Sequence, residues 1–192
     1  MLPWAAELCI IGPMTERLLL LSCCAPCSIG VIKKLKEDGT DFTVLFYNPN
    51  IRPVAEYQRR LAENKRVCAH FGVPFIDLPY ESEVWNQMTV GLENEPERGK
   101  RCDKCFFMRL KRAAAFAKAN GFTRLSSVLG ISRYKDFDQV CRAGLAAEAV
   151  SGVPYDTTDW RVYRAESAAL SKEFGLYRQN YCGCKPREPK NG

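Results

Sequence analysis

The sequence predicts an α/β protein in which a parallel sheet carries helices on both faces, folded as a single domain. Short, uniformly apolar runs alternate along the chain with longer amphipathic stretches. The apolar runs lack the polar alternation of a sheet with one solvated face, as expected for strands buried on both sides. The length of 192 residues is close to one domain, at about 150 residues per domain, and the 46% of apolar residues suffice for an ordinary core.

The chain contains the elements of this fold in alternating order. The predicted strands are Leu18–Ser22, Phe42–Tyr47, Phe75–Leu78 and Leu125–Leu129. The predicted helices are a stretch striped by Ile29, Ile32 and Leu35 before Asp38-Gly39, a stretch from Pro53 to Phe71, a third from about Asp103 to Asn120 and a fourth from about Asp136. Crossovers between parallel strands are right-handed, so the loops that follow the strands gather at one edge of the sheet.

The ends of the chain carry separate expectations. We expect residues 1–13 to be a disordered extension, residues 14–185 to form the catalytic domain and residues 186–192 to be a frayed tail. No apolar run approaches the roughly 20 residues of a membrane span. Glu16 and Arg17 also interrupt any signal-peptide core. We therefore expect a cytoplasmic protein with no membrane partner.

The sequence contains ten cysteines and one histidine, and these numbers limit the kinds of active site that the chain can form. A chain that builds its own core has no need of disulfide staples, so the cysteines call for another explanation. The single histidine, His70, disfavours a His-rich metal site and a Ser-His-Asp triad, and its place at the end of a helix is typical of a structural residue. Thiolate chemistry remains. The net charge of +6 favours a polyanionic partner such as nucleic acid.

Seven of the cysteines fall into three tight groups. Cys68 and Cys141 lie on apolar helix stripes, where we expect core residues, and Cys9 is assigned no role. The groups are Cys23, Cys24 and Cys27; Cys102 and Cys105; and Cys182 and Cys184. Thiolates in such groups hold either structural zinc or an iron–sulfur cluster, and their position at predicted strand ends favours the cluster. The last pair is suited to a second metal or to a dithiol–disulfide relay.

Four motifs in this order resemble the QueH-type epoxyqueuosine reductases, and the resemblance spans roughly Arg17 to Lys185. The motifs are Cys23-Cys24-Ala25-Pro26-Cys27, Tyr47-Asn48-Pro49-Asn50-Ile51, Arg101-Cys102-Asp103-Lys104-Cys105 and Tyr177-Arg178-Gln179-Asn180-Tyr181-Cys182-Gly183-Cys184. The resemblance implies a Rossmann-like (HUP-type) fold and a [4Fe–4S] cluster with a nearby second iron. It also implies the reduction of epoxyqueuosine to queuosine in tRNA, with electrons from an external donor.

The resemblance also implies roles for individual residues. Its implied cluster ligands are Cys23, Cys24, Cys102 and Cys105. Cys182 and Cys184 are then the redox-active pair or the ligands of the additional iron, while the role of Cys27 stays open. Deoxygenating an epoxide consumes two electrons and two protons and releases water, and the candidate proton donors are Asp103, Tyr181 and Tyr134. As a first-turn carboxylate, Asp103 equally suits the dipole of its helix.

Basic residues near the predicted edge are the candidate tRNA contacts, and we favour Lys104, Arg133 and Lys135. Two other functions fit the same motifs. One is a zinc-stabilised RNA-binding module without catalysis, which would be colourless and keep its metal in air. The other is a metal-free thiol–disulfide oxidoreductase in which Cys102 and Cys105 form the reactive pair.

Overall fold

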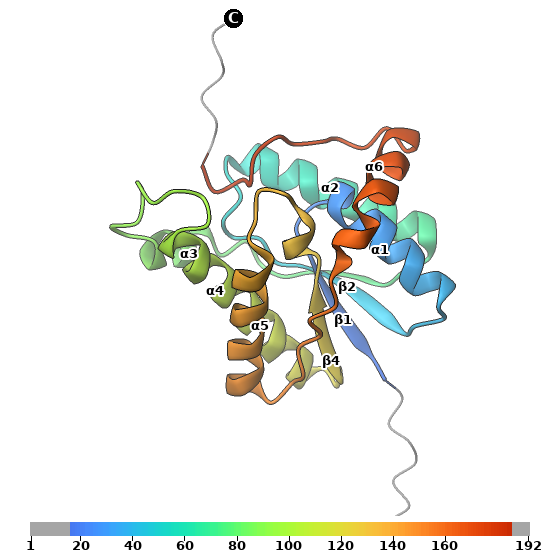
Figure 1. Cartoon of the computed structure of the whole chain (residues 1–192), viewed down its shortest axis with the longest axis horizontal. Helices are drawn as coiled ribbons and strands as arrows, with labels where there is room; N and C mark the ends of the chain where they lie inside the picture. The colour runs from blue at the N-terminus through green and yellow to red at the C-terminus, as the bar shows by residue number, and fades with distance from the viewer. Residues whose placement is uncertain (1–15, 186–192) are drawn as a thin grey trace, which may run out of the picture.

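The computed structural model describes residues 16–185. Its strands are β1 (Leu18–Ser22), β2 (Phe42–Phe46), β3 (Phe75–Asp77) and β4 (Arg124–Ser127). All three pairings are parallel, and the strand order is β3-β2-β1-β4. The predicted Rossmann-like parallel sheet is therefore confirmed (Figure 1). The predictions for residues 1–13 and 186–192 lie outside the described residues.

Helices cover both faces of the sheet, as predicted. They are α1 (Ala25–Glu37), α2 (Val54–Phe71), α3 (Ser82–Met88), α4 (Lys100–Ala119), α5 (Phe137–Ser151) and α6 (Arg164–Glu173), with the 3-10 helices η1 (Leu129–Ile131) and η2 (Trp160–Tyr163). Helices α1, α2 and α6 pack on one face, and α4 and α5 on the other (Figure 1). Within residues 16–185, no helix has the length and apolarity needed to cross a bilayer.

Some element ends, and two helices, differ from the sequence-based predictions. The fourth strand ends at Ser127, because Leu129 already belongs to η1, and α4 begins at Lys100 rather than near Asp103. Helices α3 and α6 were not predicted. The face that α6 buries consists of small polar residues, Ser167 and Ser171, so it lacks the apolar periodicity by which a helix is recognised.

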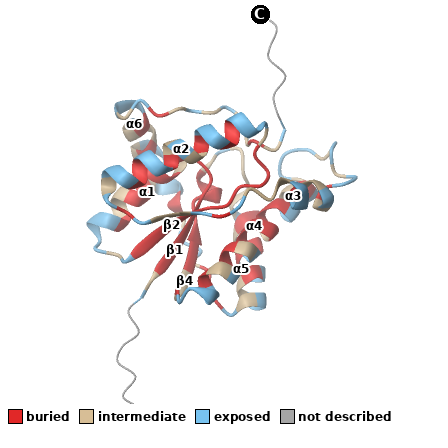
Figure 2. Cartoon of the chain, turned by 180° about the vertical axis from the view of Figure 1, so that it is seen from behind, coloured by how far each residue is buried: buried red, intermediate tan, exposed pale blue. Residues whose placement is uncertain are grey.

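The sheet is buried on both sides, which explains its uniformly apolar strands. Leu18 and Leu20 of β1 face the α1–α2–α6 layer, whereas Leu19 and Leu21 face the α4–α5 layer. All four leucines are at most 1% exposed. Figure 2 shows the strands as buried and the outer helix faces as exposed.

The strand order determines where a ligand binds. Chain connections run outward in opposite directions from β1, towards β2 on one side and β4 on the other. Open parallel sheets bind ligands at such a reversal, beyond the carboxyl ends of the strands. Cys23 follows β1 directly, and the loop from η1 to Lys135 follows β4. The fold therefore places the first cysteine motif at the expected binding edge.

A close approach at Gly144 fixes how α5 packs beside the sheet. Tyr155 pairs with Leu125 at the edge of β4, and its hydroxyl lies 2.8 Å from Ser127 Oγ. A Cβ atom at Gly144 would lie only 2.1 Å from a ring carbon of Tyr155. Only glycine therefore allows α5 to lie against this ring.

We expect Gly144→Ala to lower the free energy of unfolding by about 1–3 kcal/mol, because the ring has to move. This is opposite in sign to the usual effect of replacing a helical glycine with alanine. The measurement is urea unfolding of both forms. Ala146→Gly, at an exposed position of the same helix, calibrates the propensity effect at up to about 1 kcal/mol. An unchanged or raised stability of Gly144→Ala would show that the contact does not constrain α5.

Candidate functional site

Three cysteines form a compact group where β1 leads into α1. The Sγ atoms of Cys23, Cys24 and Cys27 all lie within 4.8 Å of one another, and those of Cys23 and Cys24 are 3.9 Å apart. We call this group the cysteine triad. Four thiolates at about 2.3 Å around one tetrahedral ion lie about 3.8 Å from each other, so the triad has the spacing of ligands to a single ion. Among the described residues, no other group of three metal-binding side chains is this compact.

The cysteine triad stabilises one thiolate in particular. Hydrogen bonds from the Cys24 and Cys27 thiols hold the pKa of Cys23 well below its usual value, and Lys135 lowers it further. The Nζ atom of Lys135 lies 3.6 Å from Cys23 Sγ. The same hydrogen bonds, together with burial, raise the pKa of Cys24 to about 12 and that of Cys27 well above its ordinary value. Negative charge on the metal-free triad therefore resides on Cys23 rather than on Cys24 or Cys27.

The other four cysteines form a second group beside the triad. Cys102 and Cys105 lie in the first two turns of α4, and Cys182 and Cys184 lie in the C-terminal segment, residues 174–185. Cys105 and Cys184 pack in one apolar cluster, while Cys102, Cys182 and Cys184 line one small crevice. We call these four residues the second cysteine group.

A strained residue supports the second cysteine group. The backbone N–H of Arg98 donates to Cys102 Sγ at 3.3 Å. Arg98 has a φ of 67°, a left-handed conformation that is uncommon for a residue with a side chain. Non-glycine residues in this conformation cluster at functional sites, where the surrounding structure maintains the strain.

One thiol of the second cysteine group is acidic, and the pKa values of the other three are raised. A hydrogen bond with Cys184, together with the charge of Lys135, lowers the pKa of Cys182 to about 5. Burial raises the pKa of Cys105 to about 11. Cys182 and Cys23 are thus the two thiols of the two cysteine groups whose pKa is lowered, and Lys135 contributes to both shifts.

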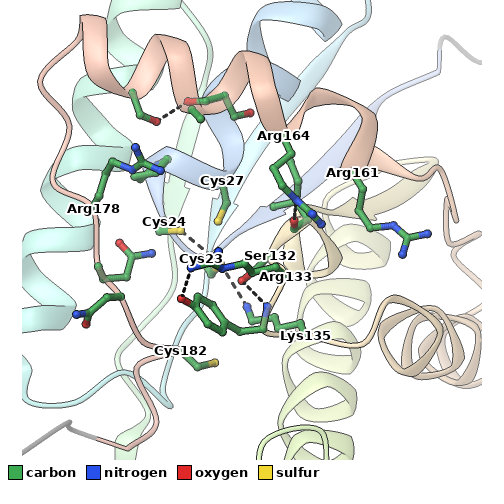
Figure 3. Close-up of a pocket in the computed structure, with 18 of the residues that line it drawn as sticks. Cys23, Cys24, Cys27, Ser132, Arg133, Lys135, Arg161, Arg164, Arg178 and Cys182 are labelled. Atoms are coloured by element: carbon green, nitrogen blue, oxygen red, sulfur yellow. Dashed lines mark hydrogen bonds between the residues drawn. The ribbon is translucent and has the colours of Figure 1, made fainter.

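The triad and Cys182 of the second cysteine group line one cavity of about 810 Å³. Cys182 and Lys135 line the crevice of the second group as well. Figure 3 shows the triad, Lys135 and Cys182 gathered among the residues that line the cavity. The volume lies within the range that accommodates a whole drug-sized molecule.

The cavity is strongly cationic. Six of its lining residues are basic, and none of its lining residues is acidic. The basic residues are Arg60, Arg133, Lys135, Arg161, Arg164 and Arg178. The ligand that this lining selects is therefore anionic.

Buried hydrogen bonds connect two of the cysteine-bearing segments. Asn64 of α2, fully buried, accepts from Ser22 Oγ at 2.7 Å and from Ser28 Oγ at 3.5 Å, which fixes the chain on both sides of the triad. Asn48 donates to the carbonyl of Ser22 at 2.9 Å. Arg109 of α4, 1% exposed, donates to Asn48 Oδ1 at 2.5 Å. Helix α4, with its two cysteines, is thereby tied to the triad.

The C-terminal segment is tied to α2 by a buried ion pair. Arg60, only 2% exposed, donates to Glu56 at 2.6 Å and to the carbonyl of Cys182 at 3.0 Å. Tyr177 donates to the other carboxylate oxygen of Glu56 at 2.8 Å. Gly183 has a φ of 114°, and its missing side chain leaves room for the Arg60 guanidinium, which a Cβ would approach to 3.3 Å. These contacts hold Cys182 and Cys184 at the cavity.

The non-cysteine residues expected from the sequence have different surroundings. Tyr181 lines the cavity, and its hydroxyl donates to the carbonyl of Arg52 at 3.3 Å. Arg133 lines the cavity as well. Asp103 does not line it, and its carboxylate accepts from Gln139 at 2.6 Å.

The two lysines among the candidate tRNA contacts differ in their surroundings. Lys135 lines the cavity, but its ammonium group faces Cys23 inside the site. Lys104 is exposed on α4 and does not line the cavity. Cys68 is buried in the core, as expected, whereas Cys141 is only half-buried.

Sequence reasoning missed the residues that organise the site. Arg60 and Glu56 carry a detectable signal, because opposite charges four residues apart on a helix commonly pair. Asn64 and Arg109 carry no such signal, because the sequence pattern around a polar helix residue is the same whether the residue is buried or exposed to solvent. Arg164 and Arg178 were missed because they reach the cavity from α6, a helix without an apolar stripe, and from the C-terminal segment.

We expect Asn64→Ala to lower the free energy of unfolding by about 1–3 kcal/mol, because it leaves the buried hydroxyl of Ser22 without its acceptor. The measurement is the midpoint of denaturant unfolding. Asn94→Ala, at an exposed loop position, is the matched control and should change stability by less than about 0.5 kcal/mol. Equal effects of the two substitutions would show that the buried amide does not support the fold.

Alkylation of the metal-free protein tests the thiol acidities. Because the pKa of Cys182 lies near 5, its thiolate is fully formed at pH 7 and we expect its iodoacetamide reaction rate to be nearly constant from pH 6.5 to 8. Cys141, also half-buried, has a raised pKa because of burial, so its rate should rise about tenfold per pH unit. Peptide mass spectrometry follows both sites. Parallel pH profiles would contradict the assignment.

The sequence model of the family described as "Epoxyqueuosine reductase QueH" matches residues 18–188. Three relatives carry that same name. The protein of Histophilus somni is 46% identical over 88% of this chain and 71% of its own length. That of Acinetobacter baylyi is 45% identical over 88% of this chain and 79% of its own. That of Thermotoga maritima is 33% identical over 86% of this chain and 87% of its own.

Among solved structures, a predicted subunit of tRNA methyltransferase from Methanocaldococcus jannaschii has a TM-score of 0.56 with this chain. It covers 88% of this chain and 94% of its own length at 12% sequence identity, so the likeness concerns the fold alone. The family match and the relatives, in contrast, extend over nearly the whole described chain. The chain therefore belongs to the QueH family of epoxyqueuosine reductases, and it is an oxidoreductase.

Proposed function

We propose that this chain reduces epoxyqueuosine to queuosine in tRNA, in a cavity that combines redox-active sulfur with cationic walls. One observation carries the proposal. Six cysteines from three distant segments border a single cationic cavity and its adjoining crevice, at the switch point of the sheet, and Cys105 packs beside Cys184 next to the crevice. Among protein side chains, thiols and the metals they bind are the groups that supply electrons.

We propose an iron–sulfur cluster as the resident cofactor, and the donor set fits one. Thiolates are the ligands such clusters require, and the site offers seven thiols without a competing carboxylate in the cavity. When bound, the cluster supplies single electrons. Cys23, Cys24, Cys102 and Cys105 are the proposed ligands. Cys27 competes for this role, because it lies within 4.8 Å of two of them.

The buried cations of the site match a cluster of negative charge. Arg109 lies close enough to Cys23, Cys105 and Cys182 to lower the pKa of each thiol. Lys135 lowers the pKa of the same three. Burying several thiolates together is costly unless opposite charges lie nearby, and these two residues supply them.

The Cys182–Cys184 pair satisfies the balance of the reaction. Oxidising two thiols to one disulfide releases two electrons and two protons. Converting an epoxide to an alkene and water consumes the same number of each. We propose that these cysteines either act as this relay or bind an additional iron, and that an external donor restores the reduced state.

We propose Tyr181 as the proton donor to the departing oxygen. Burial raises the pKa of its phenol, so the group is protonated at neutral pH. Tyr181 lines the cavity next to Cys182, and its hydroxyl has to turn from the carbonyl of Arg52 to reach a substrate, whereas Asp103 does not line the cavity. Arg60 stacks over the Tyr181 ring at 5.3 Å and fixes its position.

The charge of the cavity supports tRNA as the substrate. RNA presents a phosphate at every nucleotide, and a lining of six cations and no carboxylate attracts such a chain. A modified base must also leave its stack to reach a buried reactive group. The cavity, at about 810 Å³, is large enough to take the extruded nucleoside.

Cysteine variants separate the proposed roles. We expect Cys182→Ser and Cys184→Ser, purified anaerobically, to keep the brown colour and the sulfide of the wild type but to lose turnover at least a hundredfold. Cys23→Ser, Cys24→Ser, Cys102→Ser and Cys105→Ser should lose both colour and turnover. Cys141→Ser, outside both cysteine groups, is the control and should keep both. Loss of the cluster in Cys182→Ser, or its retention in Cys102→Ser, would contradict the ligand assignment.

The same preparations test the activity and its two alternatives. Mass spectrometry of nucleosides should show queuosine replacing epoxyqueuosine in tRNA from a strain that lacks the enzyme. A colourless protein containing zinc and unable to convert tRNA would instead be a zinc-stabilised RNA-binding module. Activity that survives removal of all metal would identify a thiol–disulfide oxidoreductase.

A further inference from the structure

The cations that line the cavity fall into two classes. Arg60 pairs with Glu56, Arg161 pairs with Asp159 at 2.8 Å, and Lys135 faces Cys23. These three have internal partners. The remaining three, Arg133, Arg164 and Arg178, make no ion pair with any residue between 16 and 185.

Arg164 and Arg178 approach the cavity from opposite sides. Arg164 begins α6, and Arg178 belongs to the C-terminal segment. In Figure 3 the two side chains flank Cys27, which lies between them above the rest of the triad. A substrate that reaches the triad between these arginines is contacted from both sides.

Both guanidinium groups are available for a ligand. Arg164 donates through Nε to the carbonyl of Ile131 at 3.0 Å, which orients the side chain. Its two terminal nitrogens, and the whole Arg178 guanidinium, have no hydrogen-bond partner among the described residues. A guanidinium forms paired hydrogen bonds with phosphate oxygens, so these free groups suit a phosphate.

A buried hydroxyl near the start of α6 points to the same kind of ligand. Ser167 is 2% exposed and lines the cavity, yet its Oγ has no hydrogen-bond partner within the described structure. Buried hydroxyls are normally paired, and this one packs against Gly30 of α1 at the wall of the cavity without a partner of its own. It lies in the first turns of α6, where the helix dipole favours an anion.

We propose that Arg164 and Arg178, with Ser167, form a two-sided clamp for the backbone phosphates that flank the target nucleotide. The proposal rests on the proposed function and specifies how that substrate enters. The phosphates stay at the arginines, at the cavity mouth, while the uncharged part of the nucleoside passes between them to the cysteines. Lys104, which does not line the cavity, has no part in the clamp.

The test is binding of a fluorescein-labelled anticodon stem-loop RNA without modifications, measured by anisotropy at several salt concentrations with the metal-loaded enzyme. We expect Arg164→Ala and Arg178→Ala each to weaken binding about tenfold, as for loss of one charged hydrogen-bond pair. Each should also lower the slope of log affinity against log salt by about 0.7, the value for one phosphate contact on a single strand. Arg164→Lys should restore the slope and only part of the affinity.

Ser167→Ala separates ligand binding from folding. Because its hydroxyl has no internal partner, we expect unchanged or slightly raised stability together with binding weakened about threefold. Arg142→Ala, an exposed arginine of α5 away from the cavity, is the matched control and should bind like the wild type. Variants of Arg164 and Arg178 that match this control would overturn the clamp.

The proposal of the clamp and the proposal of reductase activity can be refuted independently of each other. The binding assay uses RNA that the enzyme cannot reduce, so its outcome does not depend on the cysteines. Wild-type enzyme that binds this RNA but leaves epoxyqueuosine in tRNA unchanged would refute the proposed function and leave the clamp standing. Wild-type turnover with unaltered KM in Arg164→Ala and Arg178→Ala would refute only the clamp.

Discussion

The buried amide of Asn64 is the interaction on which the geometry of the site depends. Through two serine hydroxyls it fixes the chain on both sides of the cysteine triad. Its own amide group donates to the carbonyl of Arg60 at 2.7 Å, one turn earlier on α2. Arg60 in turn holds the backbone that carries Cys182. Polar groups buried in this way cannot form hydrogen bonds with water instead. Each hydrogen bond of the network therefore restricts the position of the next residue in it.

This constraint explains why sulfur groups from distant segments share one cavity. The triad follows β1, Cys102 and Cys105 begin α4, and Cys182 lies more than a hundred residues beyond α2. These segments lie far apart in the sequence, so contacts between sequence neighbours cannot bring them together. Arg109 and Arg60 connect them by bonding to Asn48 and to the carbonyl of Cys182. The two arginines also bring positive charge to the thiols, so the same residues serve geometry and electrostatics.

Lys135 shows how far a residue's role depends on where its side chain points. In the sequence it is one of several basic residues after the fourth strand, a pattern typical of a phosphate contact. In the structure its ammonium group lies 3.6 Å from Cys23 and lowers the pKa of two thiols of different groups. Its neighbour Arg133 remains at the cavity mouth, exposed to solvent.

Local sequence patterns were enough to predict the parallel sheet, the edge where the cavity lies and the concentration of cysteines at that edge. Strand leucines, helix stripes and cysteine spacing are local patterns, and they follow from burial on two faces and from helix periodicity. Three features emerge only from the folded chain: Lys135 faces Cys23, Asn64 and Arg109 are buried, and α6 contributes to the cavity. These features arise from contacts between segments far apart in the chain. A polar residue on a helix has the same local pattern whether it faces water or a buried partner.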